Sequence, residues 1–91
     1  MKIKSGYLLR TVAGTHIVVP IAERVIEFKG MMTLNEVAAT VWQFMKSEDR
    51  DYEYREILEF ILSEFDIDRE TAEKDLKKLL EQMESSGVIE K

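Results

Sequence analysis

The chain has 91 residues, with 18 acidic and 13 basic side chains and a net charge of −5. This length fits one domain and is too short for a TIM barrel or a dinucleotide-binding fold. The acidic balance argues against nucleic acid as the main partner, and the sequence contains no cysteine for a disulfide, a thiol nucleophile or a thiolate metal site.

Nothing in the chain predicts a membrane partner or an exported protein. The longest apolar run covers residues 17–22 and includes Pro20, whereas a membrane helix needs about 20 apolar residues. The first six residues lack the apolar stretch of a signal peptide. We therefore expect a cytoplasmic protein.

The first third of the chain predicts a β-hairpin. Two runs rich in β-branched and aliphatic residues, 7–12 and 15–20, flank Gly14. Glycine accepts the positive φ that a tight turn requires. Pro20 cannot donate to a strand ladder, so the second strand should end or bulge there.

Residues 30–33, Gly-Met-Met-Thr, predict a short third strand. The preceding residues 22–29 fit either a turn of helix or an extended loop. A third strand at the sheet edge would leave backbone groups open to an added strand, either from a peptide or from a second copy in a homodimer. Alternatively, one methionine packs in the core and the strand has no binding role.

The remaining two thirds predict three helices, over about 34–46, 52–65 and 69–86. In each helix, apolar residues three and four positions apart form one face. The three predicted faces are Leu34, Val37, Ala38, Val41, Trp42 and Met45; Tyr54, Ile57, Leu58, Ile61, Leu62 and Phe65; and Ala72, Leu76, Leu79, Leu80 and Met83.

Residues that favour helix ends stand at the predicted boundaries. Thr33, with Glu36 three residues later, has the form of a capping box for the first helix. Asp51 and Asp68 are the predicted N-caps of the second and third helices. Gly87 stands where a left-handed C-terminal cap belongs, and the apolar residues after it should fold back on the core.

The order of elements predicts an α+β fold that is winged-helix-like, with a three-stranded antiparallel sheet followed by a three-helix bundle. Such folds can place their third helix in the DNA major groove. Here residues 69–84 carry four basic and five acidic side chains, which gives that helix little attraction for phosphate. A DNA-binding or transcription-accessory role and a purely structural, oligomerising role remain as alternatives.

The chain lacks a constellation for catalysis. His16 is the single histidine and lies in a predicted strand, so a structural role is favoured over general-base chemistry. The acidic stretch that begins at Asp66 has Thr71 where a calcium loop needs glycine and Lys77 where it needs glutamate. We expect no enzyme, no metal site and no cofactor.

Several short motifs, taken in order, resemble the PqqD family of pyrroloquinoline quinone biosynthesis and its relatives, the RiPP recognition elements. These motifs are Ile17–Pro20, Gly30–Glu36, Ala39–Trp42, Glu64–Asp68, Asp75-Leu76 together with Leu79-Leu80, and Gly87–Glu90. The resemblance implies a peptide chaperone that binds the leader segment of a ribosomally made precursor peptide. It also implies a modifying enzyme as partner, often a radical SAM enzyme, which would itself hold any iron–sulfur cluster.

The resemblance further implies where the leader would bind. The leader would add to the third strand and lie beside the third helix. The strand would contribute Gly30, Met31, Met32, Thr33 and Leu34. The helix offers Leu80 and Lys77 on one side of its apolar face, and Asp75, Gln82 and Lys78 on the other. The sequence leaves open which side faces the groove.

Overall fold

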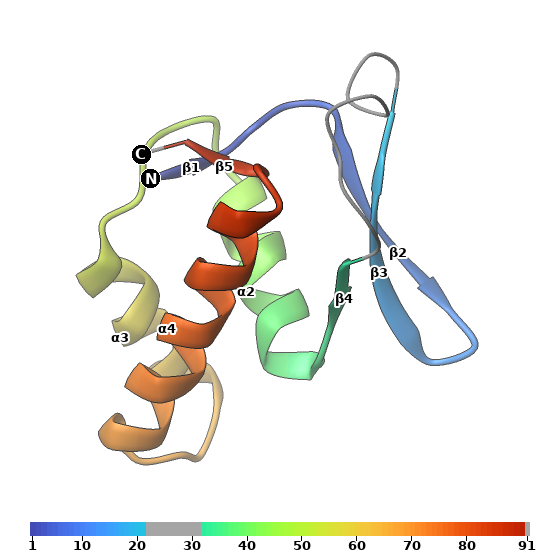
Figure 1. The fold of residues 1–91 in the computed structure, drawn as a ribbon. Helices are drawn as coiled ribbons and strands as arrows, with labels where there is room; N and C mark the ends of the chain where they lie inside the picture. Colours follow the sequence, from blue (N-terminus) through green and yellow to red (C-terminus); the bar gives the residue numbers. More distant parts are fainter. Residues whose placement is uncertain (22–31, 91) are drawn as a thin grey trace.

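The computed structural model describes residues 1–21 and 32–90, and it folds as a small sheet beside three helices (Figure 1). Its elements in chain order are β1 (Lys2–Ile3), β2 (Tyr7–Val12), β3 (Thr15–Pro20), β4 (Met32–Leu34), α2 (Glu36–Lys46), α3 (Tyr54–Glu64), α4 (Arg69–Ser85) and β5 (Ile89–Glu90). The larger sheet has the order β2-β3-β4 and is antiparallel throughout. The predicted α+β fold is confirmed. The ambiguous segment 22–29 lies outside the described residues.

The hairpin of β2 and β3 forms as predicted and projects away from the helices (Figure 1). Val12 pairs with Thr15, so the turn consists of Ala13 and Gly14, which both have positive φ, 51° and 79°. Two-residue turns with this backbone twist match the twist of paired strands. β3 ends at Pro20, as predicted. The missing N–H of Pro20 costs no hydrogen bond to β2, because the Ile21 N–H makes the next one, to the Gly6 carbonyl at 2.8 Å.

β4 is the edge strand that joins the sheet to the helices. Met32 pairs with Val18, Thr33 with Ile17 and Leu34 with His16. The side chains of Met32 and Leu34 are only 1% and 6% exposed, whereas Thr33 is exposed on the other face. β4 therefore buries one face in the core, and its second edge pairs with no strand among the described residues.

The strand continues further than the sequence predicts, and this moves the start of the first helix. Leu34 belongs to β4 and not to the helix, because its pairing with His16 holds the backbone extended. Thr33 is therefore not the N-cap. That role falls to Asn35, whose side-chain oxygen accepts a hydrogen bond from the Ala38 N–H at 2.8 Å.

The second helix also begins later than predicted, at Tyr54. The backbone of Tyr52 exchanges two hydrogen bonds with Met1, so it cannot start a helix. Asp51 is consequently not the cap. Glu53 is the N-cap, and its N–H donates to Glu56 Oε1 at 3.1 Å, as in a capping box.

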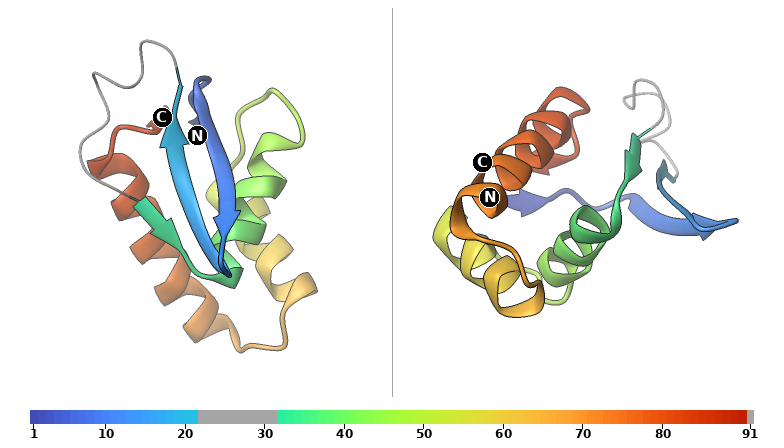
Figure 2. Two further views of the ribbon diagram at one scale, coloured as in Figure 1. Left: turned by 90° about the vertical axis from the view of Figure 1, so that its right-hand side faces the viewer. Right: turned by 90° about the horizontal axis from the view of Figure 1, so that it is seen from below.

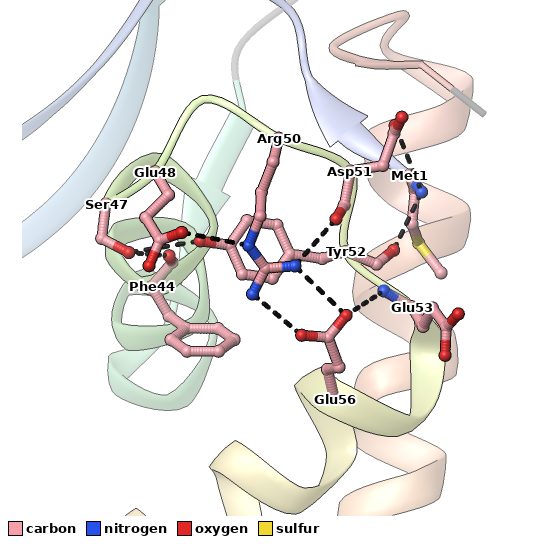
Figure 3. A network of polar contacts seen from close by, with 9 residues as sticks. All are labelled: Met1, Phe44, Ser47, Glu48, Arg50, Asp51, Tyr52, Glu53 and Glu56. Atoms are coloured by element: carbon pink, nitrogen blue, oxygen red, sulfur yellow. Dashed lines mark hydrogen bonds and ion pairs between the residues drawn. The ribbon is translucent and has the colours of Figure 1, made fainter.

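A network of polar contacts stabilises the segment that connects α2 to α3 (Figure 3). The Arg50 guanidinium donates to both carboxylate oxygens of Glu56, at 2.9 and 3.3 Å, and to Glu48 Oε2 at 3.1 Å. Its Cζ lies 4.0 Å from the centroid of the Tyr52 ring. The Arg50 hydrogen bond lowers the pKa of the Glu56 carboxyl below its usual value. Figure 3 shows all these groups converging on the start of α3.

The third helix has the predicted caps at both ends. Asp68 Oδ1 accepts from the Thr71 N–H at 2.9 Å. Gly87 has a φ of 75°, and the Val88 N–H turns back to the Met83 carbonyl at 3.0 Å. Beyond this cap, β5 pairs antiparallel with β1, which the sequence does not predict because two-residue strands show no periodicity. The pairing brings the two chain ends together (Figure 1).

The core fills the space between the sheet and the three helices. Its fully buried large side chains are Tyr7, Val18, Met32, Val41, Met45, Tyr52, Ile57, Ile61, Leu76, Met83 and Val88. Tyr54, which the helical spacing places on the buried face of α3, is instead 40% exposed. Tyr52 takes its place in the core, because the helix starts two residues later than predicted. Phe60 is half-buried and stacks on Phe44 with ring centroids 4.0 Å apart.

Candidate functional site

A groove of about 390 Å³ lies between the end of β4, the first half of α2 and the middle of α4. Figure 2 (left) shows β4 running alongside α4, which forms the opposite wall. The residues that line the groove are Thr33, Leu34, Asn35, Val37, Ala38, Val41, Ile61, Asp75, Leu76, Lys78, Leu79 and Gln82. We call this feature the strand–helix groove.

The strand–helix groove has an apolar floor and a polar rim. Its floor consists of Val37, Ala38, Val41, Ile61, Leu76 and Leu79. On α4, the polar residues Asp75, Lys78 and Gln82 stand three and four positions apart, so they form one ridge above this floor. A ligand with apolar side chains on one face and polar groups on its edges would match both surfaces.

Thr33 presents its backbone to the groove. Its carbonyl oxygen accepts a hydrogen bond from Gln82 Nε2 at 3.4 Å, and Gln82 stands on the opposite wall. In an antiparallel strand, the N–H and C=O of one residue point to the same edge, and successive residues alternate. The Thr33 N–H therefore faces the groove too, while the backbone groups of Met32 and Leu34 face β3.

The structure brings half of the ten sequence-predicted site residues into the groove. Thr33 and Leu34 come from the strand, and Asp75, Lys78 and Gln82 come from one side of α4. This geometry answers the question that the sequence leaves open, because the Asp75 side of the helix faces β4.

Three of the other predicted site residues lie outside the groove. Leu80 lines a separate apolar hollow of about 260 Å³ with Met1, Glu84 and Ile89. Lys77 is exposed on α4 and does not line the groove. Met32 lines no part of it, because its side chain is buried in the core. Gly30 and Met31 lie outside the described residues.

The contribution of α2 to the groove does not follow from the sequence pattern. Asn35, Val37 and Val41 line the groove, although the helical spacing predicts only a core-facing position for the two valines. Val37 is half-buried at the margin of that stripe. Its position at the margin is the one sequence signal for exposure to a ligand, and it does not distinguish a groove from plain solvent.

The charged groups of the groove form no ion pair with another described residue. Neither Asp75 nor Lys78 forms an ion pair within residues 1–21 and 32–90. Asp75 is half-buried at the groove wall and Lys78 is exposed. A buried or half-buried charge favours an oppositely charged partner, because removal from water penalises the unpaired form.

Catalytic or metal chemistry finds no support in the part of the chain that the structure describes. No group of three or more histidine, cysteine, aspartate or glutamate side chains is arranged there to hold a metal ion. His16 lies between two polar side chains, with Nδ1 2.8 Å from Thr11 Oγ1 and Nε2 2.8 Å from Glu36 Oε1. It thereby ties the hairpin to the start of α2. Among the described helices, none is long and apolar enough to cross a membrane.

Comparisons with known proteins find one matching family model and a solved structure with a similar fold. A family model described as coenzyme PQQ synthesis protein D (PqqD) matches residues 16–89. Among solved structures, a chain from the complex of TbiB1 with the TbiA(beta) leader peptide superposes with a TM-score of 0.70. The alignment covers 99% of this chain and 95% of that chain at 21% sequence identity, so the likeness shows a shared fold. No curated protein gives a significant match.

Proposed function

The chain belongs to the PqqD family, and from this membership and the open edge of β4 we propose that it binds the leader segment of a ribosomally synthesised precursor peptide. The leader adds as a strand to β4 and lies in the strand–helix groove. The chain then presents the rest of the precursor to a modifying enzyme. In this role it is a non-catalytic recognition module that acts in the cytoplasm.

The observation that carries this proposal is the outward-facing backbone of Thr33. A guest strand needs an N–H and a C=O that face the open edge of the sheet. Thr33 directs both toward the groove, where its carbonyl oxygen accepts one long hydrogen bond from the Gln82 side chain. TbiB1, which has a similar fold, was solved in complex with a leader peptide, and this supports a leader as the ligand.

The energetics explain why an edge strand needs the groove beside it. Each strand hydrogen bond contributes about 0.5–1.5 kcal/mol net, and ordering a disordered peptide costs about 2–5 kcal/mol. Micromolar binding requires about −8 kcal/mol, so backbone pairing at a short edge is insufficient. Apolar side chains in the groove floor, at about 1.5–3 kcal/mol each, supply the remainder.

The groove brings together Thr33 and Leu34 on the strand and Asp75, Lys78 and Gln82 on the helix. We propose that Thr33, Leu34, Asp75 and Lys78 contact the leader, whereas the Gln82 amide occupies the Thr33 carbonyl until the leader replaces it. Gly30 and Met31 precede β4 in the sequence and stay part of the proposal. Leu80 and Lys77 stand on the other side of α4, where a modifying enzyme could approach without displacing the leader.

The modifying enzyme is the second proposed partner, and a radical SAM enzyme is the leading candidate. Such an enzyme holds an iron–sulfur cluster through cysteine thiolates. This chain has no cysteine, so the cluster and the chemistry would both belong to the partner. The recognition module contributes proximity, because a bound leader raises the local concentration of the precursor at the enzyme.

A pair of variants at Thr33 tests the proposal. Thr33→Pro removes the N–H that faces the groove and leaves the ladder to β3 intact, whereas Thr33→Val keeps the N–H and changes only the side chain. Tagged wild-type protein and both variants are used to capture partners from an extract of the source cells, and mass spectrometry identifies what is retained. Circular dichroism first establishes that each variant is folded.

We expect wild-type protein and Thr33→Val to retain a short ribosomal precursor peptide together with a tailoring enzyme, and Thr33→Pro to lose the peptide. Retention of the same peptide by a folded Thr33→Pro variant would disprove strand addition. Recovery of only a self-dimer or of nucleic acid would disprove leader recognition as a whole.

A further inference from the structure

The strand–helix groove also restricts which peptide it can hold, through the register at Thr33. Because the Thr33 N–H and C=O both face the groove, a guest strand that is antiparallel to β4 places one residue opposite Thr33 that exchanges both hydrogen bonds with it. The Thr33 side chain is exposed, and those of Met32 and Leu34 are buried. The guest continues the pleat, so the residue opposite Thr33 points to solvent and its two neighbours point to the buried face of β4.

The guest residue before the paired one lies opposite Leu34 and meets an apolar surface. The floor on this side of Thr33 is made of valine, alanine, isoleucine and leucine side chains. A polar side chain there would lose its hydration without gaining a partner. The groove therefore favours an apolar residue immediately before the residue that pairs with Thr33.

The direction of the guest places it against the charges of α4. β4 and α4 run in opposite directions (Figure 1), so a guest antiparallel to β4 runs in the same direction as α4. Gln82 stands across from Thr33. Lys78 and Asp75 lie about 6 and 10 Å further toward the N-terminus of α4, at 1.5 Å per residue. A strand rises about 3.4 Å per residue. Lys78 therefore lies beside the guest residue two positions before the one that pairs with Thr33, and Asp75 lies beside the guest residue three positions before it.

The alternation of the guest agrees with the exposure of the two charges. The guest side chain two positions before the paired residue points to solvent, where Lys78 is exposed. The side chain three positions before it points inward, where Asp75 is half-buried. Neither charge has an ion-pair partner in the portion of the protein that the structure describes.

We infer that the groove selects an extended peptide with the pattern basic–acidic–apolar–any, in which the basic side chain pairs with Asp75, the acidic side chain with Lys78, and the unspecified residue with the Thr33 backbone. This inference rests on the proposed leader recognition and deepens it by naming the chemistry of the leader. Asp75 and Lys78 act in it as specificity-determining residues.

A display library of random nine-residue peptides tests the pattern. The library is selected in parallel on wild-type protein and on the charge reversals Asp75→Lys and Lys78→Glu. Lys77→Glu serves as the matched control for Lys78→Glu, because it makes the same change of charge at a position of α4 that does not line the groove. Thr33→Pro and Thr33→Val are included to test strand addition itself.

We expect wild-type protein and Lys77→Glu to enrich the same pattern. Lys78→Glu should replace the acidic position with a basic one, and Asp75→Lys should replace the basic position with an acidic one. In titrations with synthetic peptides, each mismatch should weaken binding about 2–5-fold, and the reversed peptide should restore binding to the reversed protein.

Unchanged charge preferences in both reversals would overturn this inference while leaving strand addition in place, provided that Thr33→Pro still loses the enriched pool and Thr33→Val keeps it. Enrichment of the same pool by Thr33→Pro would instead overturn the proposed function. An enriched pool without an apolar residue directly after the acidic one would overturn the register.

Discussion

The Gln82 side-chain amide donates a hydrogen bond to the Thr33 carbonyl at 3.4 Å, although the two residues are 49 positions apart in the chain. This contact spans the mouth of the strand–helix groove and occupies the acceptor that a guest strand would use. The amide of Gln82 thus imitates, in the free protein, the backbone donor of an added strand. Peptide binding must replace this hydrogen bond before the guest can pair with β4.

Gln82→Ala should therefore tighten the binding of the captured precursor peptide, because it removes the internal competitor for the Thr33 carbonyl. The lost contact is solvent-exposed and long, so we expect a gain in affinity of at most about 5-fold, equivalent to about 1 kcal/mol. Isothermal titration of wild-type protein and the variant measures it. Gln82→Asn is the matched control, since its shorter side chain keeps the amide but reaches less far. Weaker binding by Gln82→Ala would show that the amide contacts the peptide and does not compete with it.

Met32 and Thr33 should respond in opposite ways to truncation, because they alternate between the core and the exposed face of the sheet. The Met32 side chain is 1% exposed, so Met32→Ala should lower the free energy of unfolding by about 2–5 kcal/mol. Thr33→Ala should change it by no more than about 0.5 kcal/mol, as at other surface positions. Urea unfolding monitored by fluorescence of Trp42 measures both. Similar losses at the two positions would contradict the register of β4.

The burial of one side-chain face explains which parts of this fold the sequence predicts well. The helical spacing of apolar residues predicts three helices, because burial of one face imposes that period over many residues. Helix starts are less predictable, since several residues near each start can serve as a cap. Thr33 has the form of an N-cap, yet its strand pairing with Ile17 excludes it, and Asn35 caps α2 instead. That choice depends on a partner strand more than ten residues away.

The residues of the candidate site can also be predicted only in part from the sequence. The strand and the two sides of the third helix follow from the motifs, but the side that faces β4 depends on how α4 is rotated against the sheet. The core contacts of Leu76 and Met83 fix that rotation, and they place Asp75 and Gln82 in the groove and Leu80 outside it. Local periodicity carries no information on this rotation, because each side of the apolar stripe is equally compatible with a helix.

Ala13 offers a simple route to a more stable protein. It has a φ of 51° in the two-residue turn of the hairpin, a conformation that costs an alanine roughly 1–2 kcal/mol and that asparagine adopts more readily. Ala13→Asn should raise the free energy of unfolding by about 0.5–1 kcal/mol and the melting temperature by roughly 2–8 °C. Thermal unfolding measures the shift.

Gly14 provides the matched control for that prediction. Its φ is 79°, and a Cβ atom added there would meet no atom within 4 Å. Gly14→Ala therefore changes only the backbone preference and should destabilise the protein by about 1–2 kcal/mol. A neutral effect of both substitutions would contradict the left-handed turn.

Acid should destabilise the protein partly through the cap of α4. Hydrogen bonds from the Thr71 side chain and backbone hold the pKa of the Asp68 carboxyl below its usual value near 3.8. A carboxyl whose pKa is lowered by folding stabilises the protein above its unfolded pKa, and this contribution is lost as the pH falls through the folded pKa.

Asp68→Asn keeps a side-chain oxygen that can cap the helix but removes the titration of the carboxyl. We therefore expect the variant to resemble the wild type above about pH 5 and to lose less stability between pH 4 and lower values. Urea unfolding at a series of pH values tests this, and an identical acid loss in both proteins would show that the Asp68 carboxylate does not contribute. Some acid sensitivity should persist in the variant, because the hydrogen bond from Arg50 lowers the pKa of Glu56 in the same way.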